Sequence, residues 1–292
     1  MSLTSFLKDE EVCNAFRRFF KIPKFNVSAE LLAPPFTENY SLVGTAFDYL
    51  LRFYVKRLNR DAIESPWASE KALDLLFLAP LLQSRDALPF DTGIIRKAEE
   101  TIEFAKKAYG EYLKTGVANH ELFKAVLLLA QLERVYREGL EVAYKENFLD
   151  ESSVDERDIE DLRNLLSIVK PEYFKAKQIC ILNPTFGRAS RLVRGADCDL
   201  LIDDALIDIK TTKKLELKQS YFHQLVGYYV LYTIGKIDGA PSDHRVKRLG
   251  IYFSRYAYLH TFDVLYIVGS DFLDFVNWFE KKAREKYFRL SS

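Results

Sequence analysis

The sequence has little cysteine and no net charge, and each shortage excludes a class of protein. Its 292 residues include three widely spaced cysteines, Cys13, Cys180 and Cys198, without a CxxC pair. Three thiols are too few for a four-thiolate zinc or iron–sulfur site, and an odd number argues against a disulfide framework, so we expect a reducing, cytoplasmic setting. Because 42 basic residues balance 42 acidic ones, the field of the whole molecule does not attract nucleic acid. Any polyanion site must therefore be a local patch.

Long apolar runs are also missing. No segment reaches the roughly 18 apolar residues that a membrane-spanning helix needs. The first residues, MSLTSFLKDEEVC, place acids where a secretory signal requires an uninterrupted apolar stretch. We therefore expect neither a membrane association nor secretion, although 48% hydrophobic content leaves ample material for a buried core.

The apolar periodicity changes near Pro171. Before it, apolar residues recur at helical intervals over 41–60 and through most of 60–170, as in HELFKAVLLLAQLERVYREGLEVAYKENF. After it, QICILNPTFG, RLVRGADCDLLIDD and ALIDIKTT are short, rich in Ile, Leu and Val, and punctuated by turn formers. We predict a helix over 41–60, a helical region over 60–170, and strands that begin after Pro171.

The remainder of the chain alternates between the two patterns. SYFHQLVGYYVLYTIGK predicts a helix, RLGIYFSRYAYLHTFDVL predicts two strands with an aromatic turn, and SDFLDFVNWFEKKAREKYF predicts a closing helix capped by Ser270. Helices packed on a central sheet follow from this order. We expect one α/β domain over 1–292, with a large helical region before a catalytic α/β core at 171–292.

Residues 195–210, GADCDLLIDDALIDIK, carry the chemistry. In a strand successive side chains alternate faces, so Asp208 and Lys210 share one face while Ile207 and Ile209 point into the core. Two ionisable groups are thus fixed side by side on a rigid element.

A hairpin would add a second carboxylate to this face. If Asp203 and Asp204 form a two-residue loop, Asp199 lies directly across from Asp208. Asp-Asp is not the preferred pair for such a loop, and a longer loop or a bulge would shift the register. Asp197, two residues earlier on the same face, is the alternative first acid.

Two converging carboxylates repel each other unless a hard cation lies between them, and oxygen ligands suit Mg²⁺ or Mn²⁺. Phosphodiester hydrolysis uses such a cation, and a neighbouring lysine can orient water or offset charge in the transition state. The other interpretation of Asp208 and Lys210 is a solvated strand with a weak ion pair.

The segment GADCDLLIDDALIDIKTT resembles motifs II and III of the PD-(D/E)XK nuclease superfamily, and QLVGY resembles the Q-xxx-Y motif of its RecB-like branch. GTAFD, ending at Asp48, has the spacing of that branch's GxxxH motif with aspartate in place of histidine. The resemblance implies a restriction-endonuclease-like α/β fold with a central mixed sheet flanked by helices. It implies that metal is bound by the side chains or carbonyl of Asp48, Asp199, Asp208 and Ile209, and that catalysis involves Asp199, Asp208, Lys210, Gln224 and Tyr228.

Each of these positions also has a structural interpretation. Asp48 could form an intrahelical ion pair with Arg52, and Gln224 and Tyr228 could be buried polar groups in an apolar helix. His223 fits a structural role in its aromatic helix. Phosphate contacts or ordinary surface charge could explain the basic residues around the acids, Arg188, Arg191, Arg194, Lys213, Lys214 and Lys218. Core packing is favoured over base stacking for the aromatic run Tyr252, Phe253, Arg255, Tyr256 and Tyr258.

The function that follows is a Mg²⁺- or Mn²⁺-dependent deoxyribonuclease, with DNA repair, recombination or defence against foreign DNA as its setting. The alternative is a catalytically idle nuclease-fold module that binds nucleic acid or a partner protein such as a helicase. The intact set of Asp199, Asp208 and Lys210 favours the nuclease.

Overall fold

The computed structural model describes residues 2–82 and 92–288. Ten α-helices occur within these ranges: α1 (Leu3–Phe6), α2 (Glu10–Phe19), α3 (Tyr40–Leu58), α4 (Ala68–Leu82), α5 (Thr92–Thr115), α6 (His120–Glu138), α7 (Glu156–Ser167), α8 (Arg188–Leu192), α9 (Gln219–Gly235) and α10 (Phe272–Tyr287). Short 3₁₀ turns, η1 to η5, lie at Leu140–Tyr144, Glu151–Ser153, Pro171–Tyr173, Ser254–Tyr256 and Val264–Tyr266.

The six strands of the described chain form one mixed sheet. They are β1 (Ile63–Glu64), β2 (Cys180–Leu182), β3 (Leu200–Ile202), β4 (Ala205–Lys210), β5 (Arg248–Phe253) and β6 (Tyr258–Asp263), in the spatial order of the sequence. β1 pairs with β2 and β4 with β5 in parallel, and the other neighbours are antiparallel. Helix α9 connects the parallel strands β4 and β5, as parallel pairing requires a crossover.

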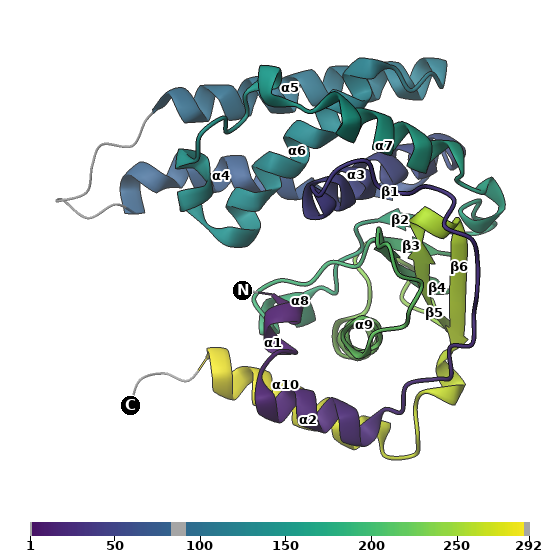
Figure 1. Ribbon diagram of the computed structural model, residues 1–292. Coiled ribbons are helices and arrows are strands. Elements are labelled where there is room, and N and C mark those ends of the chain that lie inside the picture. The colour runs from purple at the N-terminus through teal and green to yellow at the C-terminus, as the bar shows by residue number, and fades with distance from the viewer. Residues whose placement is uncertain (1, 83–91, 289–292) are drawn as a thin grey trace.

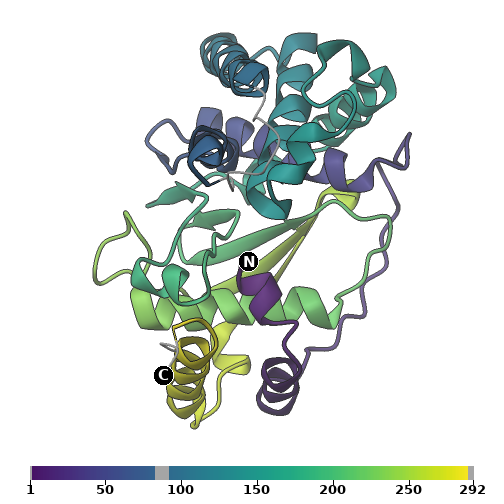
Figure 2. The same cartoon turned by 90° about the vertical axis from the view of Figure 1, so that its left-hand side faces the viewer.

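Helices cover both faces of the sheet, which confirms the expectation of an α/β protein with a mixed sheet flanked by helices. Helices α3 to α7 form the layer above the sheet in Figure 1, and α9 lies beneath it with α2 and α10 below α9. Figure 2 shows the same layers from the side. The candidate residues on β4 therefore lie between two helical layers.

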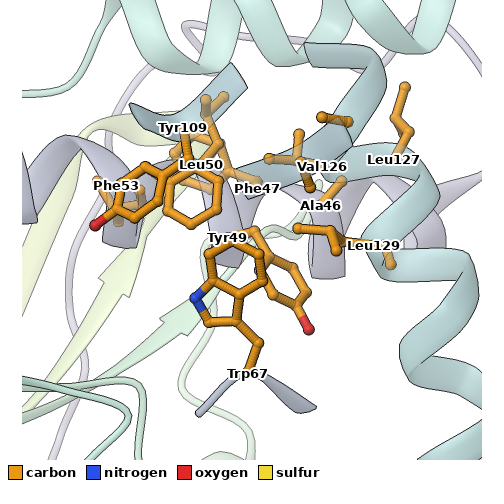
Figure 3. Packing of buried hydrophobic residues seen from close by; sticks show 14 of the residues in the cluster. Ala46, Phe47, Tyr49, Leu50, Phe53, Trp67, Tyr109, Val126, Leu127 and Leu129 are labelled. Carbon is orange, nitrogen blue, oxygen red and sulfur yellow. The ribbon is translucent and has the colours of Figure 1, made fainter. Parts of the chain in front are cut away.

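Side-chain alternation divides the buried residues into two cores. Ile207 and Ile209 of β4 pack with α3 to α7, whereas Leu206 packs with α9 on the opposite face. Figure 3 shows part of the upper core, in which Phe53 of α3 stacks on Tyr109 of α5 at a ring-centroid distance of 4.0 Å. Both faces of β3 and β4 are buried, and strands of this kind are apolar at nearly every position. Their sequences, LLI and ALIDI, show this pattern.

A buried ion pair fixes the helical layer to the sheet. Arg255, directly after β5, donates to Asp161 of α7 at 2.7 Å, and both side chains are 1% exposed. Arg255 also donates to the carbonyl oxygen of Ala33 in the segment before α3. In the aromatic run predicted to pack in the core, Tyr252 and Phe253 are fully buried and Tyr256 is buried, whereas Tyr258 is half-buried.

Two expectations of local structure were wrong and a third was incomplete. The predicted helical region over 60–170 contains helices α4 to α7, but it also contains strand β1, which extends the sheet. The segment that starts at Arg191 was predicted to be extended, but its first two residues are the last two residues of helix α8. Arg194, shortly after the helix, adopts a left-handed conformation with φ 59°. Helix α10 begins at Phe272 after Asp271, not at a Ser270 cap.

Within the described ranges, no helix combines the length and apolar character that crossing a membrane requires.

Candidate active site

The predicted hairpin register is confirmed. Leu200 pairs with Ile207 and Ile202 with Ala205, so Asp203 and Asp204 are the two-residue loop. Continuing this ladder by one residue places Asp199 opposite Asp208, on the face that α9 covers. The main-chain N–H of Ile209 donates to Asp199 Oδ2 at 2.6 Å, which holds this carboxylate against β4.

An unusual loop residue supports this register. Asp203 adopts a left-handed conformation with φ 51°, which aspartate tolerates better than most residues. Its carboxylate accepts the main-chain N–H groups of Lys177, Gln178 and Ile179 at 2.7 to 3.2 Å. A charged acceptor for three donors explains why Asp-Asp replaces the usual Asn-Gly pair here.

The structure brings every predicted site residue to one pocket of about 390 Å³. Its lining includes Asp48 of α3, Asp199 before β3, three consecutive residues of β4 and two residues of α9: Asp48, Asp199, Asp208, Ile209, Lys210, Gln224 and Tyr228. The alternative acid Asp197 lines it too. Residues that span most of the sequence thus meet at the carboxyl end of β4.

The carboxylates in this pocket disfavour each other's charge. Burial and the neighbouring Asp208 carboxylate raise the pKa of Asp199 to about 7. Burial, and then the Asp199 carboxylate, raise the pKa of Asp48 well above its usual range. Burial raises the pKa of Asp208 as well, against the effect of Lys210. Negative charge is therefore concentrated where little water can stabilise it.

Lys210 offsets part of this charge. Its Nζ atom lies 2.5 Å from Asp208 Oδ2. Burial opposes the charged ammonium, but the carboxylates of Asp208 and Asp199 outweigh burial and raise the pKa of Lys210. The ammonium is consequently a fixed positive charge at neutral pH, suited to electrostatic stabilisation and to orienting water rather than to accepting a proton.

Two polar residues of α9 hold Lys210 in place. Lys210 Nζ donates to Gln224 Oε1 at 3.2 Å, and Gln224 Nε2 donates to the Tyr228 hydroxyl at 2.7 Å. The Tyr228 ring stacks on Phe186 at 5.8 Å and is 4% exposed. Tyr228 is thus a buried polar group, as its structural interpretation states, whereas Gln224 is only half-buried and contacts both Tyr228 and Lys210.

Asp48 and Arg52 do not form the intrahelical ion pair that was the alternative to a metal-binding role for Asp48. Arg52 Nε donates to the main-chain oxygen of Asp48 at 3.0 Å, and its guanidinium lies over the ring of Tyr49. The Asp48 carboxylate lines the pocket with Asp199 and Asp208.

The structure also separates the two alternative first acids. Asp197 is paired with Arg137 of α6, whose two terminal nitrogens contact its carboxylate at 3.3 and 3.0 Å. Burial opposes the charge of Asp197, but Arg137 outweighs burial and lowers its pKa. Asp197 already has a cationic partner, whereas Asp199 has none so close among the described residues, so Asp199 is the better candidate for a metal ligand.

Sequence reasoning missed the residues of α6 that line the same pocket, among them Glu133 and Arg137. Glu133 is 7% exposed; it accepts the Tyr49 hydroxyl at 2.7 Å and Arg137 Nε at 2.9 Å. A charged residue at a core position of an apolar helix was the available signal. Glu133 stands between Leu132 and Val135, both fully buried, where its charge requires a partner.

The remaining candidates divide between surface and core. Lys213, Lys214 and Lys218 are exposed on the segment after β4, where Lys213 lies over the ring of Tyr40 at 4.3 Å. His223 is 3% exposed and packs beside Phe16 at 5.3 Å, in agreement with a structural role.

The oxygen donors of the pocket fit a hard divalent cation. In residues 2–82 and 92–288, no group of three or more His, Cys, Asp or Glu side chains could hold a metal ion by itself. Mg²⁺, however, is commonly held by one or two carboxylates, with water and substrate phosphates completing its shell. Asp208 Oδ2 is buried and, although ion-paired with Lys210, accepts no hydrogen bond of normal geometry from the described residues. This oxygen, together with Asp199 and the main chain of Ile209, provides a suitable donor set.

No protein-family model, curated protein or solved structure matches this chain.

Proposed function

We propose that this protein is a deoxyribonuclease that hydrolyses phosphodiester bonds with Mg²⁺ or Mn²⁺ on a restriction-endonuclease-like fold of the PD-(D/E)XK, RecB-like type. One observation carries the proposal: the hairpin acids Asp199 and Asp208, the strand lysine Lys210 and the helix acid Asp48 line a single pocket. The sequence places these residues in the order and spacing of that superfamily's motifs.

Asp199, Asp208 and the Ile209 carbonyl are the proposed metal ligands, with Asp48 as a further ligand from α3. A bound divalent cation would supply Lewis-acid polarisation of the phosphoryl oxygen and a more acidic water. The protein's own part is to fix the donors. The Ile209 N–H fixes Asp199, and the rigid strand fixes Asp208.

Lys210 is the proposed catalytic cation. Its charge offsets the negative charge that develops on the phosphoryl group, and its N–H groups can orient the attacking water. Gln224 restricts the rotamers of Lys210, and Tyr228 in turn holds Gln224. A preorganised ammonium costs less reorganisation during the reaction than a mobile one.

Local positive charge gives the nucleic acid a route to the pocket although the net charge is zero. Arg134 and Arg137 of α6 line the pocket, and Arg137 also lines an adjoining pocket of about 310 Å³ that Arg194 borders. Lys213 and Lys214 follow β4 on the segment before α9. Cations on two sides of the acids are where phosphate contacts would position a strand.

A cleavage screen tests the proposal. The full chain is incubated with single-stranded, duplex, linear and circular DNA and with RNA, each with Mg²⁺, Mn²⁺ or EDTA. Lys210→Met, purified identically, controls for contaminating nuclease because it keeps a side chain of similar length and removes its charge. Lys107→Ala, an exposed lysine of α5 outside the pocket, controls for the loss of one positive charge.

We expect metal-dependent cleavage of DNA by the wild type and by Lys107→Ala, and strongly reduced cleavage by Lys210→Met. Cleavage in EDTA, or equal cleavage by all three proteins, would refute the proposal. If the wild type binds DNA but cleaves no substrate with either metal, the catalytically idle binding module becomes the better account.

A further inference from the structure

A second cleft lies at the other end of β4 from the carboxylates. It encloses about 920 Å³, and none of its described lining residues belongs to the pocket that holds Asp208. The hairpin loop Asp203 and Asp204 and Arg248 at the start of β5 belong to its lining. Asp204 and Asp208 are four residues apart, so about 13 Å of strand separates the two sites.

The walls of this cleft differ in chemistry. Its apolar lining consists of Ile179, Ile202, Pro241 and Leu259, with the aromatic Tyr173 beside them. Its basic lining consists of Lys175, Lys177, Arg245, Lys247 and Arg248. The basic residues come from both sides of the hairpin loop, and the three lysines among them are exposed to solvent. An apolar surface thus lies beside a group of cations.

The acids of the cleft leave much of this positive charge available. Asp203 is occupied by three main-chain N–H groups, and Asp204 pairs with Arg248 at 2.5 Å. Glu172 and Asp243 are the other acids in the lining. Among the described residues, the side chains that form neither an ion pair nor a hydrogen bond include those of Lys175, Lys177 and Lys247.

We infer that this cleft binds a phosphorylated nucleoside, with the base against Tyr173 and Leu259 and the phosphates against the three free lysines. Its volume falls in the range of about 300 to 1,000 Å³ that small-molecule sites occupy. Phosphates favour lysine and arginine, and every base has an apolar face that packs on aromatic and aliphatic side chains. A free nucleotide and a nucleotide unit of a strand share this chemistry.

Nucleotide binding in this cleft does not require the proposed nuclease activity. EDTA removes the divalent metal that cleavage would need, so binding can be measured without cleavage. Binding of mant-ATP to the full chain is measured by fluorescence in EDTA, with displacement by unlabelled ATP and, separately, by inorganic tripolyphosphate. A fluorescein-labelled dT₁₂ strand provides the second probe. A triple variant removes the free lysines of the cleft, Lys175→Ala, Lys177→Ala and Lys247→Ala. A matched triple variant removes the same charge from exposed lysines elsewhere, Lys107→Ala, Lys114→Ala and Lys281→Ala.

We expect the cleft variant to bind the nucleotide about tenfold or more weakly, since each lost charge-assisted contact carries a substantial part of the affinity. The matched variant should bind like the wild type. ATP should displace the probe better than tripolyphosphate does, because the base adds contacts. Tighter binding of dT₁₂ than of mant-ATP identifies a strand as the ligand, and the reverse identifies a free nucleotide.

Two results would overturn the inference. The first is equal affinity of the wild type and both triple variants for both probes, or binding of neither probe by the wild type. The second is tripolyphosphate displacing mant-ATP as well as ATP does, which would remove the nucleoside from the site. Thermal melts of all three proteins verify that folding is unchanged, as expected for exposed lysines.

Discussion

Lys210 Nζ lies 2.5 Å from Asp208 Oδ2, and the two side chains leave β4 on the face that α9 covers. Residues two apart on a strand share a face, so the sequence DIK places these two side chains next to each other once it forms a strand. The hairpin then adds Asp199 opposite Asp208, so one lysine faces more negative charge than it can neutralise. The excess carboxylate is the physical reason to expect a cation at this end of the sheet.

The first prediction separates metal binding from chemistry. Asp208→Asn should lose both Mn²⁺ affinity and DNA cleavage. Lys210→Met should retain Mn²⁺ and DNA binding but cleave about 10²- to 10³-fold more slowly, as expected for removing one electrostatic contact to the transition state. Calorimetry with Mn²⁺ measures the metal, and an oligonucleotide assay measures turnover. Wild-type turnover by Lys210→Met would remove the lysine from the mechanism.

The second prediction concerns Asp48. Asp48→Asn removes a buried carboxylate that faces Asp199, so in EDTA the melting temperature should stay the same or rise. If Asp48 is a ligand, Mn²⁺ binding should weaken by about tenfold or more. Replacing a residue that only hydrogen-bonds to a metal ligand already weakens metal binding by about 10- to 100-fold. Asp61→Asn, on the exposed turn after α3, removes the same charge outside the pocket as the control. Mn²⁺ affinity equal to that of the control would assign Asp48 a structural role.

The hairpin of β3 and β4 was predictable because its determinants are local. Strand alternation fixed the faces of Asp208 and Lys210, and the loop length fixed the register of Asp199. The fit of Asp203 to the loop was less evident. It depends on three N–H groups of residues 177–179, which no local pattern places there.

The rest of the site depends on tertiary packing. Glu133 and Arg137 reach the pocket because α6 crosses above the sheet, and helical periodicity says nothing of where a helix docks. The position of Asp48 was open for the same reason, since its spacing from Arg52 suits an intrahelical pair equally well. The second cleft collects residues from Glu172 to Leu259 without any motif.

The third prediction tests Arg137, one of the residues that sequence reasoning missed. Arg137→Met leaves Glu133 and Asp197 without their shared cation, so the free energy of unfolding should fall by about 1 kcal/mol, after allowance for solvent screening at the 40% exposed Arg137 side chain. A double-mutant cycle with Asp197→Asn should give a coupling of about 1 kcal/mol. Urea denaturation in EDTA measures both.

Arg134 is the matched control for stability, because its partner Glu138 is an exposed residue one turn away at 2.9 Å. Arg134→Met should cost no more than about 0.5 kcal/mol. Equal losses from Arg134→Met and Arg137→Met would mean that the Arg137 pair contributes no more than a surface ion pair.

The last prediction is a pH dependence of stability that originates at His223. Burial, and to a lesser degree Arg17, lower the pKa of His223 from 6.5 to about 4, and its Nε2 atom is buried without a hydrogen-bond partner among the described residues. As the pH falls below 6.5, His223 binds a proton in the unfolded chain, whereas in the folded protein it stays neutral until about pH 4. The stability from neutral His223 is therefore fully present above pH 6.5 and is lost as the pH falls towards 4.

The substitution His223→Phe should remove this dependence, because the ring packs beside Phe16 and Phe222 and phenylalanine cannot titrate. With the difference between the two proteins at pH 8 taken as the reference, the variant should gain about 1 kcal/mol over the wild type at pH 5, after allowance for solvent screening. Urea denaturation of both proteins from pH 8 to pH 5 measures the difference, which cancels the titration of carboxylates common to both. Parallel stability curves over this range would show that His223 has the same pKa in the folded and unfolded protein, and would contradict its assignment as a neutral core residue.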